Sequence, residues 1–156
     1  MVQRTRQRPL LSGATQTAVL QVLAPLELRL TKHRRSLLSV LENTSRPLTV
    51  DELVVSADVP MSTAYRNLAG LVDAGIVVRV AGAGSADRYE LAERLSQRHH
   101  HHLVCTGCGL VTDFDASSQL EKLIDVEIEA LLATSGFEIT HHVFDVRGLC
   151  SDCVTG

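Results

Sequence analysis

The hydrophobic positions in the first half of the chain repeat with the period of amphipathic helices. Within residues 26–42, three leucines at 37, 38 and 41 fall at helical spacing beside a basic face at 32, 34 and 35, and Thr31 is placed to cap a helix. Residues 49–52 read Thr-Val-Asp-Glu, which matches a capping box, so a short second helix is predicted to run to Ala57. The next three residues end in Pro60 and predict a turn into a third helix.

The third helix is predicted over 61–74, with a sharper apolar stripe and small or polar residues on its opposite side. Gly75 is expected to end it, and strands are expected over 76–80 and 88–91, joined by a glycine-rich turn at 82–85. This order is typical of a winged helix-turn-helix, which reads DNA with its third helix and lays its hairpin along the phosphates. Many small α+β domains share the order, so that alternative stays open.

The last third of the chain changes to short alternating strands around one longer helix. After a linker at 92–98, four histidines at 99–102 lead into a strand, and residues 140–146 alternate so that His142 faces the interior. A helix is predicted over 119–133, and its inward residues are expected to be Leu120, Leu123, Ile124, Leu131 and Leu132. The predicted fold class is therefore α+β, a winged helix-turn-helix domain followed by an α/β domain.

Length and composition limit the size of the core. With 156 residues and 45% hydrophobic content, the chain can bury one ordinary core or two small ones, and small cores usually need a metal ion or a partner chain. No apolar run approaches the roughly 20 residues of a membrane span, and the N-terminal charges are not followed by the apolar stretch of a secretory signal. We therefore expect a cytoplasmic protein.

The net charge of −3 conceals two oppositely charged ends. Residues 1–46 carry eight Lys or Arg against two acids, whereas residues 99–156 carry nine acids against two basic residues. The N-terminal third therefore suits a polyanion, although its first three arginines could equally form a solvated tail. The expected DNA contacts are Arg34, Arg35, Ser62, Thr63, Tyr65 and Arg66. Tyr65 lies at the edge of the apolar stripe, so half-buried packing is its alternative role.

The four cysteines form two Cys-x2-Cys doublets, separated by 41 residues: Cys105, Cys108, Cys150 and Cys153. In a reducing compartment, two such doublets predict a structural zinc site, because each turn offers two sulfurs to one tetrahedral ion. A redox-active pair is the alternative. That alternative is disfavoured because neither doublet follows a strand that runs into a helix N-terminus, where a thiol pKa would fall.

The internal histidine run predicts two separate metal sites. In an extended strand, side chains alternate, so His100 and His102 share one side while His99 and His101 share the other. A His-x-His pair on one strand face converges on one ion. For any single carboxylate nearby, a solvated surface role is as reasonable as metal ligation.

With these motifs in place, the chain resembles the ferric uptake regulator family over about residues 26–153. The matching segments are 30–34 (Leu-Thr-Lys-His-Arg), 62–68 (Ser-Thr-Ala-Tyr-Arg-Asn-Leu), 74–77 (Ala-Gly-Ile-Val), 88–91 (Arg-Tyr-Glu-Leu), the histidine run into 103–109 (Leu-Val-Cys-Thr-Gly-Cys-Gly), and His142 eight residues before Cys150. The resemblance implies a winged-helix domain at 26–91, a hinge at 92–98 and a metal-binding dimerisation domain at 99–156. Residues 1–25 form a basic extension for which we identify no counterpart.

The resemblance also implies the metal ligands. The four cysteines would hold structural zinc. A regulatory site at the hinge would use Glu90, His100, His102 and Asp113. A further site would use His99, His101, His142 and an acid of the long helix, either Glu121 or Asp125.

Two departures from the family pattern leave the sensed signal open. Relatives that sense iron or peroxide carry a hinge histidine where this chain has Arg46-Pro47, and zinc-sensing actinobacterial relatives carry a cysteine where it has Ala92. The ligand types allow zinc, iron, manganese or nickel.

The resemblance therefore implies a repressor that binds palindromic DNA operators as a homodimer when its hinge site holds a divalent metal, without catalytic turnover. One alternative is a peroxide-sensing repressor of the same family, which uses iron or manganese. A small zinc hydrolase with Glu121 as base, or a metal-buffering protein, are alternatives of other classes.

Overall fold

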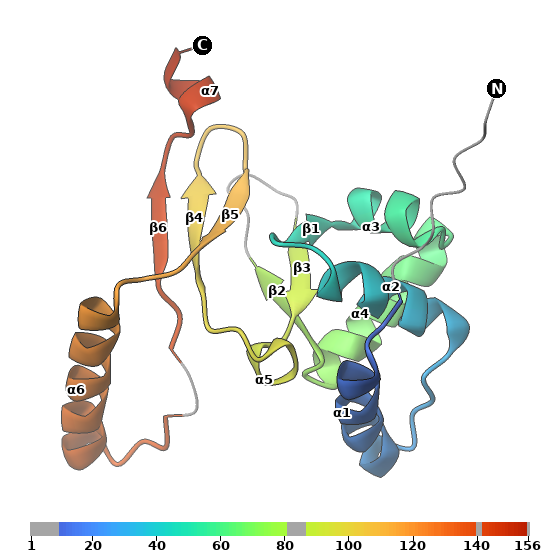
Figure 1. Ribbon diagram of the computed structural model, residues 1–156, viewed down its shortest axis with the longest axis horizontal. Helices are drawn as coiled ribbons and strands as arrows, with labels where there is room; N and C mark the ends of the chain where they lie inside the picture. Colours follow the sequence, from blue (N-terminus) through green and yellow to red (C-terminus); the bar gives the residue numbers. More distant parts are fainter. Residues whose placement is uncertain (1–9, 81–86, 140–141, 156) are drawn as a thin grey trace.

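The computed structural model describes residues 10–80, 87–139 and 142–155 of the chain (Figure 1). In chain order its elements are α1 (Gly13–Leu23), the 3-10 turn η1 (Ala24–Leu26), α2 (Lys32–Glu42), β1 (Leu48–Thr49), α3 (Val50–Ala57), α4 (Met61–Asp73), β2 (Val77–Val80), β3 (Arg88–Leu91), α5 (Glu93–Ser96), β4 (His101–Cys105), β5 (Val111–Phe114), α6 (Ser118–Ser135), β6 (Asp145–Gly148) and α7 (Ser151–Thr155). The strands form two separate sheets, in the orders β1-β3-β2 and β5-β4-β6. The α+β class with two domains agrees with the prediction.

Local capping decides where the helices of the first domain begin. Helix α2 starts at Lys32, where the Thr31 side chain accepts a hydrogen bond from the Arg34 amide, so the predicted cap at Thr31 is confirmed and residues 26–31 of the amphipathic stretch lie outside the helix. The residues before it form η1, with a left-handed Glu27 at its end. Helix α3 has the predicted capping box, since the side chains of Thr49 and Glu52 each accept from the other's backbone amide.

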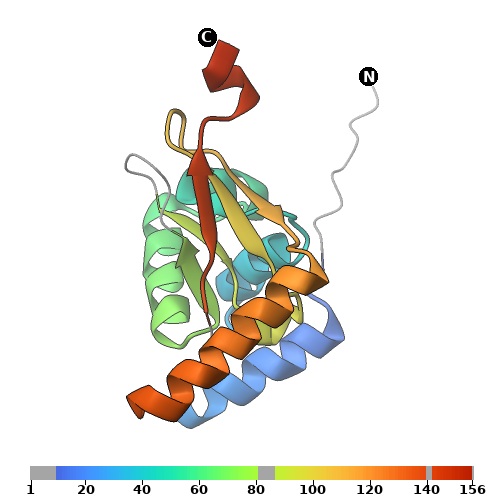
Figure 2. The same ribbon diagram turned by 90° about the vertical axis from the view of Figure 1, so that its left-hand side faces the viewer.

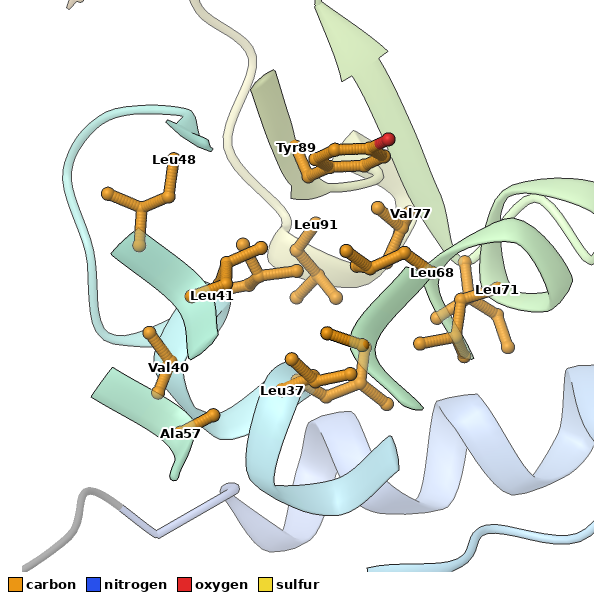
Figure 3. Packing of buried hydrophobic residues seen from close by; sticks show 14 of the residues in the cluster. Leu37, Val40, Leu41, Leu48, Ala57, Leu68, Leu71, Val77, Tyr89 and Leu91 are labelled. Carbon is orange, nitrogen blue, oxygen red and sulfur yellow. The ribbon is translucent and has the colours of Figure 1, made fainter. Parts of the chain in front are cut away.

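The core of the first domain lies between helices α2, α3 and α4 and the sheet that contains β2 and β3. Figure 3 shows Leu37 and Leu41 of α2 packed towards Leu68 of α4 and Leu91 of β3, and all four are buried. The short strand β1 also pairs with β3, which the sequence pattern did not reveal. The wing turn predicted at 82–85 lies outside the described residues. This packing fixes the outward face of α4.

Helix α1 adds a further layer to the first domain, in part of the segment for which we identified no counterpart. Its N-cap Ser12 donates from both its amide and its hydroxyl to Glu42 at the end of α2, and the Thr15 hydroxyl donates to the same carboxylate at 2.5 Å. Val19 and Leu23 are buried in the same core as α2. Residues 13–23 are therefore part of the folded domain.

The predicted linker at 92–98 contains the short helix α5. Its Leu95 is buried in the core of the first domain, and the amide of Ala92 donates to the carbonyl of Ile76 at 3.0 Å. Helix α5 is therefore packed against the first domain. The chain then enters β4, the central strand of the second sheet.

The long helix α6 of the second domain is largely exposed to solvent. Strand β6 runs from Asp145 to Gly148 and pairs in parallel with β4, so the strand predicted at 140–146 is wrong for residues 142–144, and its first two residues lie outside the described part of the chain. None of the side chains of α6 is buried, which also corrects the expectation that its leucines face inward within one chain. Figures 1 and 2 show α6 on the side of the sheet away from α4. No helix among the described residues is long and apolar enough to cross a membrane.

Candidate metal centres and DNA-reading face

Both cysteine doublets meet at one end of the second sheet, near α7 (Figure 1). Cys150 follows β6 and directly precedes α7, so the expectation that neither doublet joins a strand to a helix N-terminus is wrong for the second doublet. The sulfur atoms of Cys105, Cys108, Cys150 and Cys153 all lie within 4.8 Å of one another, and the Cys108 and Cys150 sulfurs are 3.7 Å apart. Two sulfurs about 2.3 Å from a tetrahedral zinc ion are about 3.8 Å apart, so the spacing fits zinc. Gly107 is suited to this turn, because a Cβ there would stand 2.9 Å from the Cys153 sulfur.

Hydrogen bonds from backbone amides stabilise the thiolate form of Cys105. The amides of Cys108 and Cys150 donate to the Cys105 sulfur at 3.5 and 3.2 Å, and these hydrogen bonds lower the pKa of Cys105 to about 6. Hydrogen bonds with Cys150 and the other thiols raise the pKa of Cys153 to about 12. A cluster of thiols that resists complete ionisation by itself is suited to a cation that neutralises the four charges.

A second group of ligating side chains joins the two domains. Glu90 comes from β3 of the first domain, whereas His100 precedes β4, His102 lies in β4, and Asp113 lies opposite His102 in β5. One oxygen of Glu90 lies 3.1 Å from His100 Nε2 and 3.2 Å from His102 Nε2. The four residues can place their ligand atoms within 4.8 Å of one another. We call them the hinge group.

The hinge group holds its charges by mutual pairing. Burial raises the pKa of Glu90, but hydrogen bonds from His100 and His102 outweigh burial and bring the pKa down to about 2. The hydrogen bond to Glu90 raises the pKa of His100 to about 9. Burial raises the pKa of Asp113, and the guanidinium of Arg98 lies 3.8 Å from its carboxylate. The protonated His100 therefore places a positive charge beside Glu90, in a position where a metal cation could bind instead.

A third group lies on the other side of β4. His101 Nε2 lies 2.7 Å from one oxygen of Glu121, and the other Glu121 oxygen is 3.3 Å from His99 Nε2 and 3.9 Å from His142 Nε2. The strand alternation therefore separates the histidine pairs as predicted. Of the two acids that the sequence left open, Glu121 joins this group and Asp125 does not. We call these four residues the His99 group.

Two orphaned polar atoms fit the binding of a cation at these groups. Asp113 Oδ1 in the hinge group and His142 Nε2 in the His99 group are both buried, and neither has a hydrogen-bond partner among the described residues. A buried polar atom without a partner costs free energy, which a bound ion would recover. Nitrogen and oxygen donors suit zinc, iron, manganese or nickel, so these donor sets fit a divalent metal.

The face of α4 expected to read DNA is exposed. Ser62, Tyr65 and Arg66 point to solvent, and Thr63 is half-buried. Tyr65 is 55% exposed, so both its expected DNA contact and its alternative role in half-buried packing stay predictions. This leaves the first turns of α4 free to enter a groove.

The two arginines of α2 are engaged within the chain. Arg34 donates to the carbonyl of Arg29 at 2.8 Å and lies against Gly70 of α4, whereas Arg35 bonds Gln16 of α1. Gly70 permits this approach, since a Cβ there would stand 3.3 Å from the Arg34 guanidinium. These arginines therefore fix α2 against α1 and α4 as well as adding positive charge.

Two carboxylates beside these groups escaped the sequence analysis. Asp145 lies beside His102 across the parallel pair of strands, with its Oδ1 3.4 Å from His102 Nδ1. Glu93 of α5 lies 3.1 Å from His99 Nδ1. Glu93 contacts the histidine nitrogen that faces away from the ligand group, which is where an orienting carboxylate acts. Asp145 lies beside the corresponding nitrogen of His102 without a hydrogen bond to it. No spacing rule in the sequence marks either one.

Comparison with known proteins gives one consistent family. A sequence model of the ferric uptake regulator family matches residues 26–147. The peroxide-responsive repressor PerR of Staphylococcus saprophyticus is 33% identical over 130 residues, which cover 80% of this chain and 82% of that protein.

Solved structures agree in fold. The ferric uptake regulator of Helicobacter pylori aligns with a TM-score of 0.71 at 21% identity, covering 95% of this chain and 97% of that chain. The ferric uptake regulator of Vibrio cholerae aligns with a TM-score of 0.61 at 27% identity, covering 85% of this chain and 99% of that chain.

Proposed function

The chain belongs to the ferric uptake regulator family of metal-responsive transcriptional regulators, and from this premise we propose that it is a repressor whose hinge group converts metal occupancy into operator binding. The observation that carries the proposal is the shared position of Glu90 and His100. One belongs to the sheet that packs under the DNA-reading helix, and the other precedes the central strand of the second domain, yet their side chains are 3.1 Å apart. An ion held by both restrains the angle between the domains.

This arrangement needs a population shift and no chemical turnover. A metal that binds the closed arrangement better than open ones increases the closed fraction by its difference in binding free energy. If the closed arrangement places two DNA-reading helices at the spacing of a palindrome, free metal concentration sets operator occupancy. The protein would act in the cytoplasm, where the DNA is.

We assign structural zinc to the four cysteines and a divalent regulatory metal to the hinge group. The sulfur spacing and the donated backbone amides support the first assignment. Glu90, His100, His102 and Asp113 supply nitrogen and oxygen atoms, and the orphaned Asp113 oxygen supports their use as ligands. The His99 group is assigned a further divalent metal on the same grounds.

We further propose a homodimer formed through the second domain. Leu123, Val126 and Leu131 on α6 are 64%, 60% and 55% exposed, although a helix of this composition ordinarily buries its apolar face. Leu103 and Val146, which are paired across β4 and β6, are also exposed on the second sheet. A second copy of the chain would cover this surface and place the two DNA-reading helices in a symmetric pair.

Metal titration of operator binding tests the proposal. A DNA duplex selected by the wild-type protein from random sequences would be bound by chelated protein that is titrated separately with Zn(II), Fe(II), Mn(II) and Ni(II). The proposal requires at least one metal to tighten specific binding by fivefold or more, about the lower limit of a useful coupling. Equal affinity with and without every metal would contradict it.

The relationship to PerR favours one second candidate, a peroxide-sensing repressor. In that case Fe(II) in the hinge group would react with hydrogen peroxide, and a neighbouring histidine would gain one oxygen atom while peroxide is reduced to water. Treatment of the Fe(II)-loaded protein with peroxide, followed by mass spectrometry of the peptide that contains residues 99–102, separates the candidates. An added oxygen with loss of DNA binding supports peroxide sensing, and an unmodified peptide supports the metal-responsive repressor.

A further inference from the structure

Helix α5 contacts both the end of the DNA-reading helix and the His99 group. We propose that Glu93 and Arg94, neighbours in α5, make this helix a mechanical link through which a metal ion in the His99 group fixes the position of α4. The inference rests on the proposed function, since it needs a metal in the His99 group and DNA on α4. It concerns residues outside all three ligand groups.

On the DNA-reading side, α5 is attached to the end of α4. Arg94 Nη2 donates to the carbonyl of Gly75 at 2.7 Å and to that of Ala74 at 3.3 Å, where α4 ends. A Cβ on Gly75 would stand 2.9 Å from this guanidinium nitrogen, so glycine permits the close approach. Leu95, the next residue, is buried in the first-domain core. Movement of α5 therefore moves the end of α4.

On the metal side, α5 is attached to the start of the histidine run. Both oxygens of Glu93 lie 3.1 Å from His99 Nδ1, and one of them accepts from the amide of His100 at 3.4 Å. The other ring nitrogen of His99, Nε2, faces Glu121 at 3.3 Å. His99 thus places one nitrogen in the ligand group and turns the other towards α5.

Ion binding at His99 would strengthen this contact for a chemical reason. Ligation through Nε2 would leave Nδ1 as the protonated nitrogen, and that N–H would donate to the Glu93 carboxylate as a charge-assisted hydrogen bond. The bond fixes the histidine ring and the carboxylate together. Glu93 and Arg94 are adjacent in one helical turn. An ion in the His99 group, which the family resemblance places in the dimerisation domain alone, would therefore also restrain the DNA-reading domain.

The first test uses Arg94, which lies outside every ligand group. Arg94→Gln should leave the operator affinity of chelated protein within about twofold of wild type. It should reduce the gain in operator affinity on Zn(II) addition by about fivefold or more. Lys122→Gln, which removes the same charge from an exposed site on α6, is the matched control and should keep the full gain. An Arg94→Gln gain equal to that of the control would overturn the link.

A double-mutant cycle tests whether the part of the Zn(II)-induced gain that depends on Arg94 originates in the His99 group. His142→Ala removes a ligand of the His99 group and leaves the hinge group intact. If the signal passes through α5, His142→Ala combined with Arg94→Gln loses no more of the Zn(II)-induced gain than the larger single loss. Losses that multiply would mean that the two residues act independently, which contradicts the proposal.

Glu93 provides the conservative comparison. Glu93→Gln retains an oxygen that can accept from His99, whereas Glu93→Ala retains none, so the glutamine variant should keep more of the gain than the alanine variant. Equal gains in the two variants would count against the link. A wild-type protein that shows no Zn(II)-induced gain would instead refute the proposed function, and this outcome is distinct from a normal wild-type gain that Arg94→Gln leaves unchanged.

Discussion

Arg88 and Glu52 connect the wing strand to the capping box of α3, with the Arg88 guanidinium 3.6 Å from the Glu52 carboxylate. Arg88 also donates from Nε to the carbonyl of Gly109 at 3.0 Å, in the turn between the first two strands of the second domain. One side chain therefore spans from helix α3 across β3 to the metal-binding domain. Contact between the domains thus extends beyond the proposed ligands, and it gives the hinge a defined arrangement for metal to stabilise.

The first prediction concerns the pH dependence of metal binding. The pKa of His100 is raised to about 9 by Glu90, from an ordinary value of 6.5, and a metal requires the neutral imidazole. Below about pH 9, Zn(II) must displace that proton, so its apparent affinity for the hinge group should rise roughly tenfold per pH unit for each proton displaced. Zn(II) titrations against a competing chelator at pH 6.5, 7.5 and 8.5 measure this slope. A flat affinity over that range would show that His100 is not a ligand.

The pairing of His100 with Glu90 also determines how the free energy of unfolding of the chelated protein should change with pH. Because the folded pKa of His100 is raised, its stabilisation is complete below 6.5 and is lost as pH rises through about 9. Because the folded pKa of Glu90 is lowered to about 2, its stabilisation is present above 4.5 and is lost as pH falls through about 2. The contribution of the pair to the free energy of unfolding should therefore be largest between about pH 4.5 and 6.5.

The second prediction concerns the cysteine group. Cys153→Ser should lose one tightly bound zinc and much of the folded second domain, since structural zinc contributes on the order of 10 kcal/mol in small domains. Zinc content by atomic emission and the melting temperature measure both effects. Ser151→Ala, in the same helical turn, is the control and should keep both values. A Cys153→Ser protein with full zinc content would remove the structural assignment.

The third prediction concerns the reading face. Arg66→Ala should weaken specific operator binding by about 1–3 kcal/mol if Arg66 makes a bidentate base contact, without changing metal content or assembly. Lys122→Ala in the other domain should leave operator affinity unchanged. Gel-shift titration compares the variants. If Arg66→Ala binds as tightly as wild type, a different face of α4 reads the DNA.

The fourth prediction concerns the exposed apolar surface of α6. Leu131→Asp places a charge in the proposed dimer interface and should shift the protein to a monomer, as measured by sedimentation velocity. Glu129→Ala, an exposed polar position on the same helix, should remain a dimer. A dimeric Leu131→Asp protein would place the interface elsewhere.

Local sequence signals predicted much of the fold because their physical causes are local. The capping box at Thr49 and Glu52 determined the start of α3, and the strand alternation of the histidines separated the two ligand groups. Helix α1 was not predicted, because its position depends on hydrogen bonds from Ser12 and Thr15 to Glu42, which lies 27 to 30 residues further along the chain. Asp145 was missed for the same reason, because only the pairing of β4 with β6 brings it beside His102. Glu93 lies only six residues before His99, but no spacing rule marks it as a partner.

The two errors about the second domain have different causes. Alternation placed a strand at 140–146, but pairing with β4 begins only at Asp145 because the partner strand fixes the register. The leucine pattern of α6 predicted a buried apolar face, but this face is exposed among the described residues, and the proposed second copy of the chain would cover it. A sequence pattern cannot distinguish burial within a chain from burial between two chains.

The central claim is that the hinge group, more than the His99 group, couples metal to operator binding. The direct measurement compares operator affinity with and without Zn(II) for His100→Ala combined with His102→Ala and for His99→Ala combined with His101→Ala, alongside zinc content and melting temperature. The first variant should be a folded, zinc-containing dimer that loses most of the gain in operator affinity and keeps at most the smaller share that passes from the His99 group through α5. The second should have a lower melting temperature and retain part of the gain. A full gain in the first variant and none in the second would contradict the account.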